Sequence, residues 1–549
     1  MTQFTTEPPT FNLWTEPWIT LERPDGTLDT PRGLEYTLLY AREYRSLYEQ
    51  SPLVVAGIHR LLVAILHYAL KPNGKDYQDW NHLDLQRLWA LPEFPAAEIR
   101  QFGEVYDHRF DLFSADAPFM QSTDIPALLK LPKKAKPPEL ETVAYLMPEI
   151  PTGSNVIHYR HGSESTDVFC PACAGKGLVI MPAFTAKGGS GKAPSINGTP
   201  PIYILPGGET LYHSLRASLT TRPYQPGRTV NVDLVWWTRS PAIVEFKKID
   251  TRDRNQRGLT NIGYLHGLTF TPRRVWLKPE KLNLSCTRCG QTSDWIVRKI
   301  VYQAGESPSH VNREEFWRDP FVSYYPTSKE SPVPSKAIVP KRDIALWRNF
   351  VGLFLPLPAD GKQKDWAANV LLQVSQITGD EYPFRCVGMV TKDASAVEWL
   401  DADLTVPLQL RLDPIRGQDV RNGFTFAEGC AKNILAKYFK RLLAASDKNK
   451  RYFTLRDQML ADYWAALSHP FLSDFVPGMA KDEREDSYHR WIDTVVSEGK
   501  RAFRAAALLA GHDGDALEKQ ARAISDCEIA LLKKRKAHLS KREKGEAHE

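Results

Sequence analysis

The pattern of apolar and polar positions predicts different structures in successive parts of the chain. The first fifty residues mix short apolar runs with Pro and Gly, and the run Phe11-Asn-Leu-Trp-Thr-Glu-Pro-Trp-Ile19 is typical of a strand that enters a turn. Apolar residues then recur at helical spacing from residue 53 to 66. Ser51 and Pro52 precede them as a cap and a first-turn proline, so we expect a helix there.

The rest of the chain falls into two parts. Between about residues 110 and 410 the apolar segments are short and are separated by most of the Pro and Gly, which indicates α+β structure with long loops. Beyond about residue 420 come four amphipathic helical stretches, and we expect the second to end at Pro470 and the third near Gly511. Such helices with shorter connections predict a four-helix bundle. Their apolar faces lie within residues 434–443, 455–467, 491–503 and 517–532.

These patterns predict an α+β protein of two domains, because 549 residues exceed what one hydrophobic core usually serves. The first is a large mixed domain over residues 1–412, and the second is the C-terminal four-helix bundle over residues 413–549. The composition, 42% hydrophobic and 25% charged, is typical of soluble globular proteins. We find no run of about 18 apolar residues and no basic, then apolar, N-terminus. We therefore expect a cytoplasmic protein without membrane association.

Four of the seven cysteines form two CxxC pairs. Each pair can direct two thiolates at one ion, so together the pairs can form a tetrahedral four-sulfur zinc site. Four protein ligands leave no position for water, and the predicted zinc is therefore structural: a zinc knuckle that stabilises the intervening residues 174–285. The predicted ligands are Cys170, Cys173, Cys286 and Cys289.

The alternative is that these pairs are unligated thiols in unrelated loops or a redox pair. A redox motif is a single CxxC beside a βαβ unit, whereas here two pairs occur, each followed by Gly. The remaining cysteines have apolar or helical surroundings and are interpreted as small core residues. They are Cys386, Cys430 and Cys527.

Positive charge collects locally although the net charge is only +6. A single basic cluster is more often solvated surface than a binding site. Several clusters in one chain, together with a zinc-stabilised region, favour a surface that contacts phosphates. The clusters are Lys130, Lys133, Lys134 and Lys136, then Lys448, Lys450 and Arg451, and finally Lys533, Lys534, Arg535 and Lys536.

No catalytic motif is present in the sequence. Gly188-Gly-Ser-Gly-Lys192 is similar to a phosphate-binding loop, but Ala186 and Ala193 stand where a Walker A motif needs Gly and Ser or Thr. HExxH, GxSxG and dinucleotide-binding motifs are absent, and the histidines lack metal-ligand spacing. The glycine-rich loop still offers backbone N–H groups for nucleic-acid phosphates or a minor groove. The alternative is a flexible surface loop, although Lys187 and Lys192 flank the glycines.

Several segments in order resemble one family, the large subunit (CasA) of the type I-E CRISPR Cascade surveillance complex. The resemblance lies in colinearity over nearly the whole chain, including the helical C-terminus, rather than in any one motif. The segments are Phe11 to Ile19, Ala117-Pro-Phe-Met-Gln121, residues 155–169, the first CxxC pair, the glycine loop, Asn197-Gly-Thr-Pro200, Gly263-Tyr-Leu-His-Gly267 and the second CxxC pair with Gly290-Gln291.

The resemblance implies DNA recognition without catalysis. In such complexes guide RNA pairing reads the target, while a protein subunit reads a short protospacer-adjacent motif in double-stranded DNA and helps to separate the strands and form the R-loop. The glycine loop would lie against the minor groove, whose degenerate code leads us to expect tolerance of several motifs. The residues concerned are Gly188, Gly189, Ser190, Gly191 and Lys192.

Two further DNA contacts follow from the resemblance. A lysine finger comes shortly after the second CxxC pair, where Arg298 and Lys299 are the nearest basic residues, although a strict count ends nearer Ala304. A strand-separating wedge corresponds to Lys392-Asp393 before Ala394-Ser395. The chain departs there from the glutamine-containing form of the family.

The resemblance also implies partners. Residues 155–169 are similar to the segment that docks near the 5′ end of the guide RNA, and the bundle would contact the small subunits and the opened DNA. The subunit would also join the backbone and guide-end subunits and form the landing surface for a helicase-nuclease. The residues implied are His158, Arg160 and His161 in the docking loop and Lys437, Lys440 and Arg441 in the bundle.

Two other classes of function stay open. A zinc-dependent hydrolase or nuclease needs an open metal position or a carboxylate cluster, which four cysteines do not provide. A zinc-stabilised scaffold would bind only proteins, and its basic clusters would serve solubility.

Overall fold

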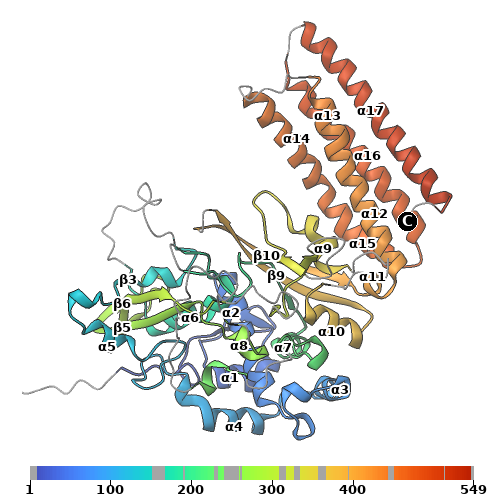
Figure 1. The fold of residues 1–549 in the computed structure, drawn as a ribbon. Helices are drawn as coiled ribbons and strands as arrows, with labels where there is room; N and C mark the ends of the chain where they lie inside the picture. The colour runs from blue at the N-terminus through green and yellow to red at the C-terminus, as the bar shows by residue number, and fades with distance from the viewer. Residues whose placement is uncertain are drawn as a thin grey trace, which may run out of the picture. The chain divides into compact units, whose positions relative to one another are not determined.

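The computed structural model describes residues 9–150, 167–188, 192–227, 233–239, 259, 262–307, 317–326, 334–355, 366–392, 395–442, 450–511 and 514–545. The chain divides into two compact units (Figure 1). Unit 1 comprises residues 1–342, 366–377 and 382–405, and unit 2 comprises residues 343–365, 378–381 and 406–549. The chain passes between the two units more than once, so they do not correspond to a single cut in the sequence. The predicted domain boundary between residues 412 and 413 stays a prediction.

Helix α2 (Pro52–Ala69) is the core helix of unit 1. Our expectation of no apolar run of this length was wrong, since α2 is long and apolar enough to cross a membrane, but 94% of it is buried inside the protein. Its polar side chains have partners there: Arg60 lies 2.6 Å from Asp319. Ser51 occupies the predicted cap position without making a side-chain capping bond.

Helix α6 (Pro171–Phe184) packs against α2 (Figure 1). The two backbones meet at Gly57, where a Cβ atom would lie 2.8 Å from the carbonyl oxygen of Val179. Within α6, Gly175 and Gly177 similarly admit the side chains of Leu13 and Leu146. Residues without a Cβ are therefore required where these elements cross.

A three-stranded antiparallel sheet lies next to α6. Its order is β3-β6-β5, with β3 (Leu140–Thr142), β6 (Thr292–Ala304) and β5 (Arg273–Ser285). Strands β5 and β6 form a hairpin whose register shifts between Lys278 and Pro279. Proline has no N–H to donate, so the ladder bulges at that point.

A second three-stranded sheet has the order β10-β9-β4, with β4 (Tyr203–Pro206), β9 (Glu381–Lys392) and β10 (Ser395–Pro407). Two-stranded pairs join β1 (Thr20–Glu22) to β2 (Ser46–Tyr48) and β7 (Tyr324–Pro326) to β8 (Pro334–Ala337). The strand expected over residues 11–19 was wrong: turns and isolated bridges fill this segment, because Asn12 caps the turn by accepting from the N–H of Trp14.

The other helices of unit 1 surround this core. They are α1 (Leu34–Leu39), α3 (His82–Ala90), α4 (Ala96–Tyr106), α5 (Ile125–Leu129), α7 (Leu211–Ala217), α8 (Tyr264–Leu268) and α10 (Asn369–Ile377). The predicted mixture of helices and sheets is confirmed.

Unit 2 is mainly helical in its described part. In Figure 1, α16 (Arg484–Leu508) runs alongside α12 (Pro414–Cys430), α14 (Lys450–His469) and α17 (Gly514–Glu543), and it packs against all three. The shorter helices are α9 (Phe350–Phe354), α11 (Gln409–Leu412), α13 (Ala436–Phe439) and α15 (Val476–Ala480).

The expected helix end at Pro470 was wrong. A π-helical turn, Pro470–Phe475, carries α14 into α15, and a second π-helical turn, Ala431–Leu435, carries α12 into α13. The wider turn accommodates Pro470, which has no N–H to donate to the helical hydrogen-bond ladder. Phe475 then stacks on Trp491 of α16 at 5.0 Å between ring centroids, so the continued helix is held by core packing.

Candidate metal centre and glycine loop

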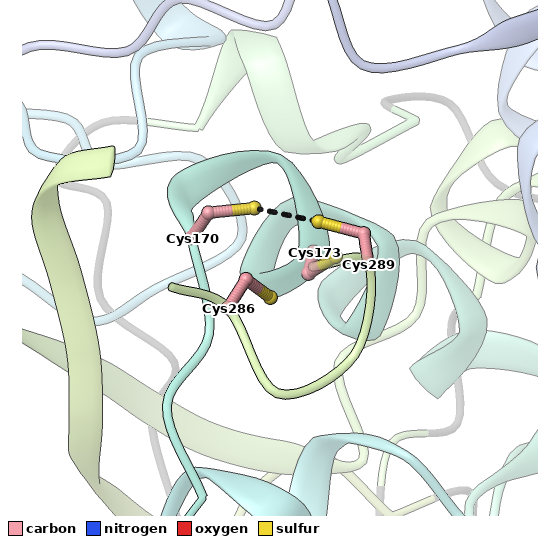
Figure 2. Close-up of side chains that lie close together, drawn as sticks. All are labelled: Cys170, Cys173, Cys286 and Cys289. Atoms are coloured by element: carbon pink, nitrogen blue, oxygen red, sulfur yellow. Dashed lines mark hydrogen bonds between the residues drawn. The ribbon is translucent and has the colours of Figure 1, made fainter. Parts of the chain in front are cut away.

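The four cysteines of the two CxxC pairs come together in unit 1. Figure 2 shows their side chains pointing towards one another, two from the start of α6 and two from the turn between β5 and β6. Their four Sγ atoms all lie within 4.8 Å of one another. The first pair thus lies at a helix N-terminus. The second pair is followed by Gly290, whose positive φ of 76° suits glycine.

The geometry of the cluster fits a tetrahedral metal ion. The Sγ atoms of Cys170 and Cys289 are 3.7 Å apart, which excludes a disulfide, and all four cysteines are free. A Zn–S bond of about 2.3 Å gives a tetrahedral edge of about 3.8 Å. Cys170, Cys173 and Cys286 are buried, while Cys289 is exposed. The donor set and its spacing therefore suit zinc.

The thiols also perturb one another. Hydrogen bonds with Cys170 and Cys173 hold the pKa of Cys286 well below its usual range, and a hydrogen bond with Cys173 lowers the pKa of Cys289 to about 6. Conversely, hydrogen bonds with Cys170, Cys286 and Cys289 raise the pKa of Cys173. Some thiolates thus form readily, but four together need a compensating cation.

The cysteine turn between β5 and β6 holds both ends of the segment that precedes α6. On one side, Arg288 lies between the paired cysteines and donates to Glu149 at 2.8 Å. On the other side, the N–H of Thr287 donates to the carbonyl of Val168 at 2.7 Å. Residues 151–166 lie between these two contacts, so the turn fixes both ends of that segment.

The opposite end of α6 is held by Arg273, the first residue of β5, whose side chain is 1% exposed. Its guanidinium donates to the carbonyl of Ala186 at 2.8 Å and to the carbonyl of Ala193. These two carbonyls flank the glycine loop, one on each side. The N–H of Ser195 donates to the carbonyl of Thr185 at 2.8 Å and closes the base.

Tyr302 of β6 completes this base. Its ring centroid lies 5.5 Å from the guanidinium carbon of Arg273 and 5.7 Å from Nζ of Lys192. Burial lowers the pKa of Arg273 and raises the pKa of Tyr302, so a neutral phenol faces the guanidinium. One hairpin therefore contacts α6 at both ends, through the cysteines at its turn and through Arg273 and Tyr302 at its open end.

Comparison with known proteins places this arrangement in a family. The model of the CRISPR-associated protein Cse1 family matches residues 12–505. The chain belongs to this family.

Three relatives illustrate the likeness. A CRISPR-associated CasA/Cse1 protein of Thermus thermophilus is 32% identical over 224 residues, a match that spans 39% of this chain and 40% of that protein. The crystal structure of Thermobifida fusca Cse1 is 20% identical, with a TM-score of 0.72 over 96% of this chain and 98% of that one. A chain of a CRISPR RNA-guided surveillance complex is 18% identical, with a TM-score of 0.69 over 96% and 100% of the two chains.

Several of the site residues predicted from the family resemblance lie outside the described part of the chain. Gly188 and Lys192 are described, and the N–H of Gly188 donates to the carbonyl of Lys192 at 3.0 Å. Lys392 ends β9 and Ser395 begins β10, so the predicted wedge falls where these adjacent strands are joined. Outside the description lie Gly189, Ser190, Gly191, His158, Arg160, His161, Asp393 and Ala394.

The two cations expected as the lysine finger differ in their surroundings. Arg298 lies at the bulge of β6 and donates to Glu280 through two N–H groups, one of them at 2.8 Å, so its charge is balanced. Lys299 lies on the central strand, opposite Thr142 of β3. Ala304, where the strict count ends, lies opposite Arg273. Among the described residues, Lys192 and Arg273 are cations that contact the base of the glycine loop.

In unit 2, Lys437, Lys440 and Arg441 are all exposed on or next to α13. Arg441 pairs with Asp526 of α17 and lies over the ring of Tyr438 at 4.3 Å. The structure thus places the four cysteines at one end of α6 and the glycine-loop base at the other, while Lys437, Lys440 and Arg441 belong to the other unit.

Sequence reasoning missed Arg273 and Tyr302. A signal for Arg273 was present, because Arg273, Val275 and Leu277 share one face of the strand and are all buried, whereas Arg274 and Trp276 between them are half-buried. An arginine at the start of such an apolar face is expected to point inward.

Proposed function

We propose that this chain is the non-catalytic large subunit of a type I-E CRISPR Cascade effector in the cytoplasm. It recognises the protospacer-adjacent motif in double-stranded DNA, helps to separate the strands and form the R-loop, and recruits the helicase-nuclease. Membership of the Cse1 family and the fold shared with a chain of an RNA-guided surveillance complex support this role. Its partners are guide RNA, the backbone and small subunits, and target DNA.

The observation that carries the proposal is the attachment of α6 at both of its ends. Arg273 bonds the carbonyls on both sides of the glycine loop, while the cysteine cluster holds the other end of the same helix. A loop with a fixed base loses less conformational entropy when its N–H groups meet a DNA groove. Such a loop suits recognition through the degenerate minor-groove pattern.

Structural zinc at Cys170, Cys173, Cys286 and Cys289 belongs to this proposal. The same cysteine turn bonds Glu149 and Val168, next to the predicted guide-docking loop with His158, Arg160 and His161. One ion would thus hold the ends of the RNA-docking loop and, through α6, the DNA-reading loop. Zinc with four thiolates is closed, so it supplies folding energy rather than reactivity.

The remaining assignments are proposals for the same complex. Lys392 and Asp393 act as the wedge. Lys299 is the lysine finger that enters the groove, because the charge of the neighbouring Arg298 is already balanced by Glu280. In the four-helix bundle, exposed Lys437 and Lys440 contact the backbone of the opened strand, and Arg441 does so after leaving Asp526.

The nuclease alternative has less support. Within the described residues, the cysteine cluster is the group of metal-ligating side chains close enough to hold an ion, and four sulfur ligands leave no site for an activated water. A protein-only scaffold has no need of a buried arginine that fixes a glycine loop.

The experiment is to assemble the chain with guide RNA and partner subunits and to measure binding to duplex targets that differ only in the adjacent triplet. Replacing Gly189 with Leu is expected to abolish target binding while the complex still assembles and the chain keeps its unfolding midpoint. The control is Gly514→Leu, at a position with open space around it. Unchanged target affinity in the Gly189 variant contradicts the proposal, as does triplet-independent binding by the natural chain.

A further inference from the structure

Four lysines between α5 and β3 form one of the basic clusters of the sequence and have no part in the function proposed above. Lys130, Lys133, Lys134 and Lys136 are all exposed, and none makes an ion pair with another described residue. One acidic residue, Glu139, stands between them and β3. The segment therefore carries a net positive charge that nothing in the described structure balances.

The backbone of this segment is ordered by its sequence. Pro132 precedes a 3-10 turn, Lys133–Ala135, in which the N–H of Lys136 donates to the carbonyl of Lys133 at 3.0 Å. Lys136 has a positive φ of 51°, and two prolines follow it. Proline restricts the chain on both sides of the turn, so the lysines lie on a preformed projection rather than on a free coil.

The segment crosses the sheet at the end that carries the glycine loop. Before it, the N–H of Ser122 donates to the carbonyl of Val275 on β5, and Asp124 pairs with Arg274. After it, Leu140 of β3 lies opposite Val301 of β6. Residues 125–139 therefore pass from one edge of the sheet to the other, beside the end where β5 starts and β6 finishes. Arg273 holds the glycine loop at that same end.

We propose that Lys133, Lys134 and Lys136 bind phosphates of the duplex next to the triplet contacted by the glycine loop. This inference rests on the proposed function. Four extended residues from Leu140 back to Lys136 span about 13 Å. At about 3.4 Å per base step, that reach corresponds to phosphates within about four base pairs of the triplet.

The chemistry of the segment favours duplex DNA over single-stranded RNA. Single-strand sites combine cations with aromatic rings on which bases stack. The run Lys130-Leu-Pro-Lys-Lys-Ala-Lys-Pro-Pro138 contains no aromatic residue. Lysines without aromatic partners act as point charges on a phosphate backbone, so they add affinity without reading sequence.

The test uses the full chain with the three substitutions Lys133→Gln, Lys134→Gln and Lys136→Gln. Binding to duplexes that differ only in the triplet is measured by fluorescence anisotropy between about 50 and 200 mM salt. The negative slope of log K against log salt is expected to decrease in magnitude by roughly 2 to 3, at about 0.9 per lost phosphate contact. Affinity should fall by the same factor for every triplet.

The matched control removes three exposed lysines in unit 2 that lie outside the basic clusters, by Lys481→Gln, Lys519→Gln and Lys544→Gln. An unchanged slope in this control supports the proposal, whereas an equal fall in both triple variants shows that only net charge matters and overturns it. A larger loss for single-stranded RNA than for duplex DNA also overturns it. If the segment variant binds as the natural chain does while Gly189→Leu loses target binding, this inference fails and the proposed function stands.

Discussion

Arg273 links the sheet to the glycine loop through one side chain. Its planar guanidinium reaches two carbonyls at once, on Ala186 and Ala193, which a lysine ammonium cannot match in geometry. The neighbouring Arg274 has the same chemistry but pairs with Asp124 instead of bonding the loop carbonyls. The two adjacent arginines can therefore be compared directly: Arg273 bonds the loop carbonyls, whereas Arg274 makes an ion pair with a carboxylate.

Arg273→Lys is expected to lose at least one of these charge-assisted bonds and to lower the free energy of unfolding by about 1.5–3 kcal/mol. Triplet discrimination by the assembled complex should fall with it, because the loop base is no longer fixed on both sides. Denaturant unfolding and competition between duplexes measure the two effects. Arg274→Lys is the control, and an equal loss of discrimination in both variants contradicts the role assigned to Arg273.

The sequence predicted the cysteines better than it predicted Arg273. A CxxC pair has a strong chemical meaning at a fixed spacing, so Cys170, Cys173, Cys286 and Cys289 could be grouped from their positions in the chain alone. Arg273 has no such motif, and its function depends on two carbonyls some eighty residues away in sequence. Long-range contacts of this kind become visible only when the chain is folded.

Helix α6 packs against α2 and ends shortly before the glycine loop, so this helix pair supports the loop. The spacing of apolar residues predicted α2, since periodicity is a local signal. The close approach of α6 was not predicted, because a glycine in a helix indicates a crossing only when the partner is known. The same limit explains the misplaced end at Pro470, where tertiary packing on Trp491 overrides the local tendency of proline to end a helix.

Gly57→Ala is expected to destabilise unit 1. The added Cβ would lie 2.8 Å from the carbonyl oxygen of Val179, so α2 and α6 must separate, at a cost of about 1–3 kcal/mol. The measurement is the denaturant midpoint, with Gly514→Ala as the control because nothing lies within 4 Å of its added Cβ. A Gly57 variant as stable as the control contradicts the close packing of α2 and α6.

At the scale of the whole molecule, the change of pattern near residue 420 indicated a separate helical part, and the chain does form two compact units. The sequence did not indicate that residues 343–365 and 378–381 belong to the second unit, since short irregular segments carry no periodicity. Family membership came from the order of many weak segments and is supported by the match over residues 12–505. The roles of individual DNA-contacting residues stay proposals.

The central claim is that metal binding at one end of α6 fixes the glycine loop at the other. Amide hydrogen exchange of the full chain tests it most directly, by comparing the zinc-loaded protein with the same protein after chelation and with Cys173→Ser. The control is Cys386→Ser, a buried cysteine outside the cluster.

The account predicts that removing the metal or Cys173 speeds exchange around the cysteines and also at Gly188 and Ser195, whose N–H groups bond the carbonyls of Lys192 and Thr185. Exchange in α16 should not change. Unchanged exchange at Gly188 and Ser195 after the zinc is gone would contradict the claim.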